Sequence, residues 1–111
     1  QLRQYAHTQP GIWARVGPLL RLLEAAAASE TELRELQEEL DAQRHAGLVR
    51  FGRLLRERGA LRERMTAERA ADIIVTLGSL ATYNSLVVTR GWTHEQYEAW
   101  LADTLQHCLL A

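Results

Sequence analysis

Residues 66 to 110 constrain the fold more than any other stretch, because they hold two apolar helical patterns separated by only four residues. Gly91 can adopt the left-handed conformation that ends a helix, and Trp92 follows it in position to cover the helix end. Thr93, with Gln96 three residues later, forms the capping-box pattern that begins another helix. The joint therefore predicts a tight helical hairpin, suited to presenting two helices to a second copy of the chain.

The rest of the chain is also helical in pattern, since alternation with period two is nowhere sustained. Thr66 is positioned to cap the third helix, and Ser29, with Glu32, to cap the second. Pro18 predicts a kink in the first helix, and a break of the second near Gly47 stays open. The sequence thus predicts an all-α, antiparallel helical bundle with helices over about 10–28, 30–58, 66–90 and 94–110. Residues 2–8 are either a preceding turn or the first part of the first helix, and the sequence leaves both open.

The length, net charge and cysteine content of the chain limit which classes of protein it can belong to. The 111 residues are enough for one domain over 1–111, and a net charge of −1 gives no basic excess for gripping a polyanion. The single cysteine, Cys108, excludes an internal disulfide and suits a reducing cytoplasm. No signal-peptide pattern opens the chain, and no apolar run reaches the roughly 18 residues of a membrane span. Because Met65 is the only methionine, we expect a fragment whose natural start lies upstream.

The closing hairpin carries more apolar surface than one neighbouring helix would cover. Small residues recur at helical spacing along one side of 66–90, which lets a partner helix approach closely. We therefore predict that the last two helices of two subunits form an intersubunit four-helix bundle, with ordinary internal packing as the alternative. The predicted dimer interface comprises Ala71, Val75, Gly78, Thr82, Ser85, Trp100, Leu101, Thr104, Leu105 and Cys108.

The run TAERAADIIVTLGSLATYNSLVVTRGWTHEQYEAWLADTL resembles the C-terminal part of TetR-family transcriptional regulators. The upstream motifs WARVGPLLRLLEAAA and QRHAGLVRFGRLLRERGAL are similar to earlier helices of the same domain, so the resemblance covers nearly the whole chain in order. It implies a cytoplasmic homodimer, the effector-binding and dimerisation domain of a repressor. The family's helix-turn-helix lies N-terminal to this domain. The resemblance therefore implies DNA contact only through a domain that this chain does not contain.

The resemblance also implies a pocket among the first three helices for a small, apolar or aromatic effector. Such sites are mostly apolar, with a few polar groups that orient the ligand. The same side chains could instead fill an ordinary helical core, and the sequence leaves this alternative open. The predicted pocket lining comprises Trp13, Val16, Leu20, His45, Leu48, Phe51, Leu55, Leu77, Leu80, Tyr83 and Asn84.

No residue pattern indicates catalysis, a cofactor or a metal. His94 and Glu98 are four residues apart and His107 adjoins Cys108, but neither pair extends to three or four ligands. Neighbouring helix positions point about 100° apart, so His107 is badly placed to activate the cysteine. We therefore predict no catalytic residue, no metal, no cofactor and no membrane partner. The alternative function is a helical adaptor or scaffold domain that binds another protein.

Overall fold

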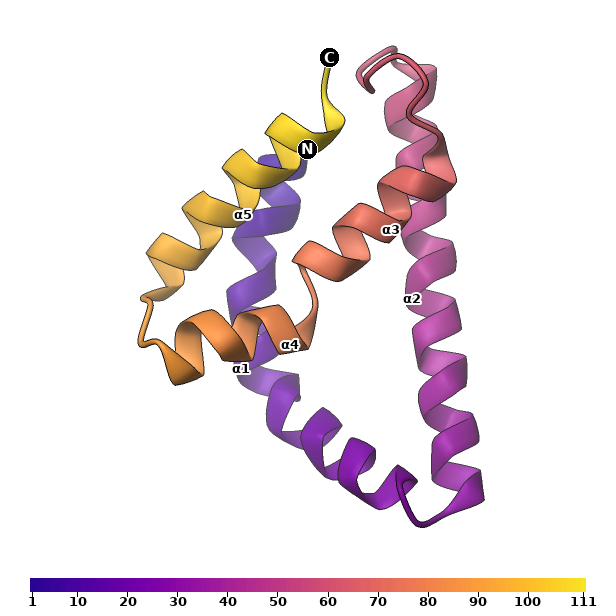
Figure 1. Ribbon diagram of the computed structural model, residues 1–111, viewed down its shortest axis with the longest axis vertical. Coiled ribbons are helices and arrows are strands. Elements are labelled where there is room, and N and C mark those ends of the chain that lie inside the picture. Colours follow the sequence, from indigo (N-terminus) through magenta and orange to yellow (C-terminus); the bar gives the residue numbers. More distant parts are fainter.

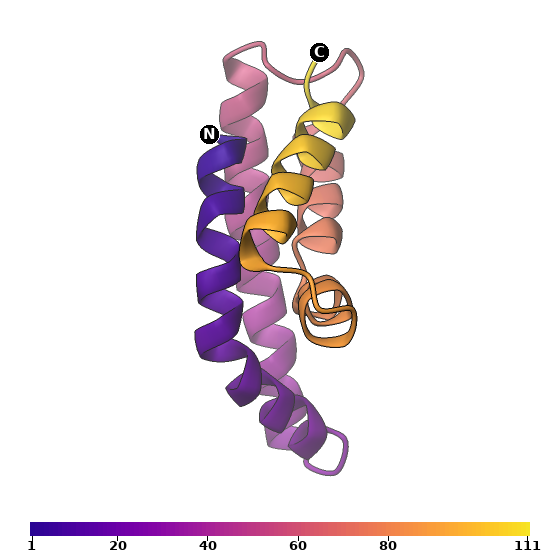
Figure 2. The ribbon, with the colours of Figure 1, turned by 90° about the vertical axis from the view of Figure 1, so that its left-hand side faces the viewer.

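The computed structural model describes residues 1–111 and confirms the all-α prediction (Figure 1). Two layers are visible in Figure 2: α1 and α2 form one, and the remaining helices form the other. The molecule measures 44 × 31 × 17 Å, so it is only two helices thick. Its elements are α1 (Leu2–Ala27), α2 (Thr31–Glu57), α3 (Ala67–Leu77), α4 (Leu80–Tyr83), the π-helix η1 (Asn84–Thr89) and α5 (His94–Leu109).

The core lies where α5 packs against α1 and α3, with α2 covering α3 from the other layer. Fully buried residues recur every fourth position of α5, at Tyr97, Leu101, Leu105 and Leu109. This spacing places them on one face of a helix with 3.6 residues per turn. Each such side chain contributes about 1.5–3 kcal/mol by leaving water. Ile74 of α3 completes the set of large side chains that are removed from solvent.

Of the two alternatives for residues 2–8, the structure shows the first part of the helix. Helix α1 begins at Leu2, because Leu2, Ala6 and Trp13 continue one buried face toward the N-terminus. Figures 1 and 2 show α1 bending in its second half, the half that contains Pro18. An interior proline removes one backbone hydrogen bond and clashes with the preceding turn, which explains a bend there.

The second helix runs without a break through Gly47. Its predicted cap is wrong: Glu30 occupies the N-cap position and no side chain caps the helix. The Ser29 hydroxyl instead donates to the Ala26 carbonyl at 3.2 Å, so it serves the end of α1. At its C-terminus, α2 is followed by Gly59 in the left-handed region, with φ of +69°, as a helix-ending glycine requires.

One glycine of α2 lies against the backbone of α3. A Cβ atom on Gly52 would come within 2.7 Å of the Ala67 carbonyl oxygen and 3.1 Å of the Ala67 Cα. Both are backbone atoms near the start of α3, just after the cap that Thr66 provides as predicted. The missing side chain of Gly52 therefore sets how closely α2 and α3 approach.

The predicted continuous helix over 66–90 is wrong. Helix α3 ends at Leu77, and Ser79 begins α4 by accepting a hydrogen bond from the Thr82 amide at 3.2 Å. Figure 1 shows the chain changing direction at this joint. The backbone then widens into η1, where the Arg90 amide bonds to the carbonyl five residues back. Wide turns of this kind are rare in helices and occur often at functional sites.

The hairpin joint forms as the sequence predicts. Gly91 has φ of +75°, and the Trp92 amide donates to the Leu86 carbonyl at 2.9 Å. Thr93 and Gln96 exchange both hydrogen bonds of a capping box, at 2.9 and 3.1 Å. The Trp92 and Trp100 rings are nearly perpendicular, with centroids 6.2 Å apart.

One expectation about membranes needs correcting. By length and composition alone, the 23 residues Ala67–Thr89 are sufficient to cross a bilayer. Only 22% of its most apolar window is buried within the chain, but a single segment of this kind, here interrupted between α3 and α4, meets a test of length and composition alone. The segment therefore gives weak evidence for a membrane span.

Candidate functional site

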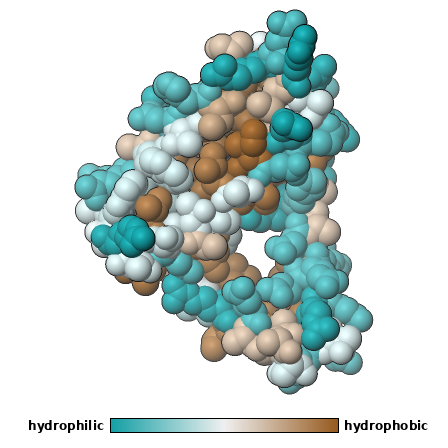
Figure 3. Space-filling model, in the orientation of Figure 1, coloured by the Kyte–Doolittle hydropathy of each residue, from teal (hydrophilic) through white to brown (hydrophobic).

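A cavity of about 420 Å³ lies between the second half of α1, the first half of α2 and α4. In the space-filling view an opening is visible between these parts of the chain (Figure 3). Small-molecule sites usually have volumes of about 300–1,000 Å³, so the cavity is large enough for a ligand. Its apolar wall includes Leu20, Leu23, Leu40 and Leu80.

The structure brings part of the predicted pocket together. Trp13, Leu20, Leu80 and Asn84 line the cavity. Tyr83 and Asn84 also border an adjoining recess of about 270 Å³, which shares Trp13 with the main cavity.

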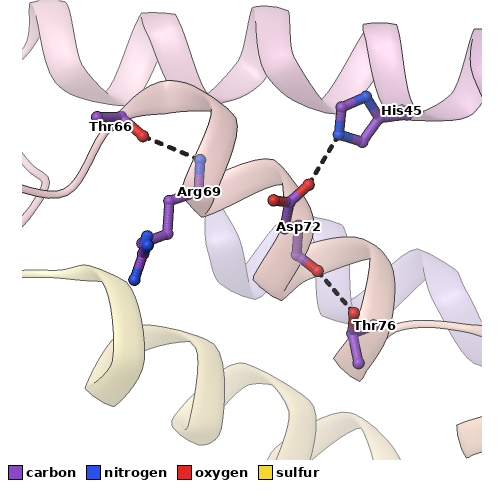
Figure 4. Close-up of polar contacts among 5 residues, drawn as sticks. All are labelled: His45, Thr66, Arg69, Asp72 and Thr76. Carbon is purple, nitrogen blue, oxygen red and sulfur yellow. Dashed lines mark hydrogen bonds and ion pairs between the residues drawn. The ribbon is translucent and has the colours of Figure 1, made fainter.

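The other predicted lining residues lie elsewhere, and several belong to the core, which was the alternative left open. Leu48 and Leu55 are buried in the core cluster, Phe51 and Leu77 pack against it, and Val16 is exposed. The remaining predicted residue, His45, contacts α3 instead of a cavity. Its Nε2 lies 2.9 Å from Asp72 Oδ1 (Figure 4). Both side chains are solvent-exposed, so this ion pair contributes little to stability.

A polar cluster joins the cavity to the break between α3 and α4. The Gly78 carbonyl accepts hydrogen bonds from Trp13 Nε1 and from Arg44 Nη2, each at 3.0 Å. The Arg44 guanidinium carbon also lies 5.1 Å from the centroid of the Trp13 ring, within cation–π range. Side chains from α1 and α2 therefore satisfy a carbonyl at the end of α3, and both side chains line the cavity.

Sequence reasoning missed Arg44. Its spacing shows only that Gln37, Asp41 and Arg44 share one face of α2, and in the structure all three line the cavity. A charged residue on a polar helix face usually points to water. For that reason the sequence alone does not single out Arg44 as a cavity residue.

Three tyrosines near this cluster differ in how their hydroxyls are paired. The Tyr83 hydroxyl lies 2.8 Å from His94 Nε2, whereas the hydroxyls of Tyr5 and Tyr97 are buried without a hydrogen-bond partner. Burial raises the pKa of all three phenols above the ordinary value, most strongly for Tyr97. Gly78 lies close to one of these tyrosines, because a Cβ atom on Gly78 would be 2.6 Å from the Tyr5 hydroxyl oxygen.

This difference predicts opposite effects of removing a hydroxyl. Tyr97→Phe is expected to raise the free energy of unfolding by about 1 kcal/mol, because it removes a buried polar atom that has no partner. Tyr83→Phe is expected to lower it by about 1 kcal/mol through loss of the bond to His94. Urea denaturation of both variants measures the difference, and equal losses of stability would contradict the description of Tyr97.

The predicted dimer interface also divides between core and surface. Ala71, Leu101 and Leu105 are fully buried within one chain, and Gly78 is buried too, so these four are not available to a partner. The other members keep exposed surface, and Figure 3 shows apolar side chains gathered over α3 and α5. The partly or fully exposed members are Val75, Thr82, Ser85, Trp100, Thr104 and Cys108.

No cluster of three or more His, Cys, Asp or Glu side chains is arranged to hold a metal ion. Comparison with known proteins found no matching family model, curated protein or solved structure.

Proposed function

We propose that this chain is the ligand-sensing and dimerisation domain of a TetR-like transcriptional repressor. The observation that carries the proposal is the cavity of about 420 Å³ between three helices, in which six of the twelve lining residues are hydrophobic and four of those are leucines. These features suit a small, largely apolar or aromatic effector. DNA binding belongs, in this proposal, to a helix-turn-helix domain outside this chain.

The cavity adjoins the part of the chain that would carry a signal. Leu80 and Asn84 line it, and the backbone continues from them through η1 into the hairpin and α5. An effector that prefers one arrangement of this segment by about 1.4 kcal/mol changes DNA affinity tenfold. The paired DNA-binding domains must match half-sites about 34–36 Å apart, so a small rotation between subunits is enough.

Residual apolar surface on the hairpin layer supports a homodimer. Val75, Trp100 and Thr104 remain partly exposed, and Val88 of η1 is 57% exposed. Pairing of this face with its copy would form a four-helix bundle. A standard interface of this kind buries about 1,200–2,000 Å².

A second candidate function is an adaptor that binds another protein. Leucines at the far end of the α1–α2 layer favour it, since Leu19 and Leu22 are 67% and 69% exposed and Leu36 is 43% exposed. Contiguous exposed apolar patches often mark protein contacts. An adaptor would use this end of the molecule and would not need the cavity.

Two measurements test the proposed function. Sedimentation velocity at micromolar concentration is expected to show a dimer. A thermal-shift screen of small apolar and aromatic compounds is expected to yield ligands, because saturation at 100 times the dissociation constant adds about 2.7 kcal/mol of stability. A monomer without any ligand response would overturn the proposal, and specific capture of another protein by that monomer would favour the adaptor.

A further inference from the structure

We infer that the cavity selects an organic anion, a carboxylate with an apolar tail, and that Arg44 holds its head group. This inference rests on the proposed ligand-sensing function and adds the chemical class of the effector. Three observations carry it: the fixed position of Arg44, the absence of a carboxylate partner for it, and the apolar wall beside it.

The Arg44 guanidinium is held in place before any ligand arrives. It is partly buried, donates to the Gly78 carbonyl at 3.0 Å, and has its central carbon 5.1 Å from the Trp13 ring centroid. These contacts come from two different helices and hold the group at the cavity. A guanidinium has five N–H donors in a rigid fork. The Gly78 carbonyl takes one, and the Tyr5 phenol also lies against the group, where Arg44 partly offsets the rise in the Tyr5 pKa caused by burial; the remaining donors are left for a ligand.

No carboxylate of the protein neutralises this charge. The ion pairs of the chain involve Arg3, His7 and His45, and no carboxylate oxygen lies within 4.0 Å of the Arg44 nitrogens. Two acids, Glu24 and Asp41, also line the cavity, but both are exposed. Water and salt screen exposed charges far more than partly buried ones. A ligand inside the cavity therefore interacts more strongly with the charge of Arg44 than with the charges of Glu24 and Asp41.

The rest of the cavity suits a tail without charge. Leu20, Leu23, Leu40 and Leu80 line it beside the Trp13 ring. A carboxylate can bind a guanidinium through two parallel N–H···O bonds, which are stronger than bonds between neutral groups. An amphipathic acid would satisfy both the guanidinium and the leucines at once.

The test compares three probes with one tail: octanoate, octanol and octylammonium. We expect octanoate to bind most tightly in isothermal titration at neutral pH. Arg44→Gln is expected to weaken octanoate about tenfold or more while leaving octanol within a factor of about two, because only the charge-assisted bonds are lost. Arg44→Lys is expected to retain part of the affinity, since the charge remains but the fork does not. Circular dichroism checks that each variant is folded.

A second variant keeps the test valid if Arg44→Gln does not fold. Asp41→Asn removes an exposed acid from the cavity rim and is expected to tighten octanoate binding and to weaken octylammonium binding. The assignment to anions would be overturned if octylammonium bound more tightly than octanoate and lost this affinity in Asp41→Asn. The cavity would in that case still be a ligand site. Failure of all three probes to bind would overturn the inference, whereas the proposed function would still be judged by dimerisation and the wider ligand screen.

Discussion

Replacing Gly52 by alanine is expected to lower the free energy of unfolding by about 2–3 kcal/mol, the typical cost of overpacking a tight contact. The added methyl group would lie 2.7 Å from the Ala67 carbonyl oxygen and 3.1 Å from the Ala67 Cα. No rotamer can relieve this contact, because both neighbours are backbone atoms. Helix α3 would have to move away from α2 and open the core behind Ile74.

Gly47 provides a matched control on the same helix. A Cβ there would meet only the end of the Arg50 side chain at 3.7 Å, an ordinary contact. Gly47→Ala is therefore expected to stabilise the protein by about 0.5–1 kcal/mol, the usual gain from replacing a helical glycine. Urea denaturation compares the two variants. Similar changes in both would show that α2 and α3 are not in close contact at Gly52.

Placing a charge on the exposed side of α5 is expected to break the proposed dimer. Thr104 is partly exposed and lies outside the core cluster. In a two-fold symmetric bundle, Thr104→Arg introduces two charges into one interface, because the substitution occurs once in each subunit. Unpaired or like charges in an interface cost several kcal/mol, so we expect the dissociation constant of the dimer to rise about 100-fold or more.

Ala99→Arg is the control for this experiment. Ala99 is also exposed on α5, but it borders Arg3, Glu95 and Glu98 on the side away from the predicted interface. Sedimentation equilibrium is expected to show dimers for the wild type and for Ala99→Arg, with monomers for Thr104→Arg. Equal dimerisation of all three would place any self-association surface elsewhere.

Local chemistry made parts of the fold predictable. The capping box of Thr93 and Gln96, the cap at Thr66 and the left-handed Gly91 depend on neighbours within a few residues. The break at Gly78 depends instead on distant partners. Its carbonyl is satisfied by Trp13 and Arg44, which are 65 and 34 residues away in sequence. Apolar spacing continues on both sides of the break, so periodicity alone indicated one helix.

The site was less predictable than the fold for a related reason. Periodicity shows which residues share a face of a helix, but it does not show whether that face meets a cavity or a neighbouring side chain. Leu20 and Leu48 carry the same kind of pattern, yet one lines the cavity and the other fills the core. Arg44 could not be assigned because its role depends on Trp13 and Gly78 lying beside it.

The interruption between α3 and α4 also affects which sequence changes this protein can tolerate. In an unbroken helix, inserting or deleting one residue rotates everything beyond it by about 100° relative to everything before it. Ser79 caps the start of a separate helix, α4. The direction in which α4 side chains point is therefore not fixed by the direction in which α3 side chains point. A change in the length of the cavity wall on α4 is therefore expected to leave the packing of α3 against α2 in place.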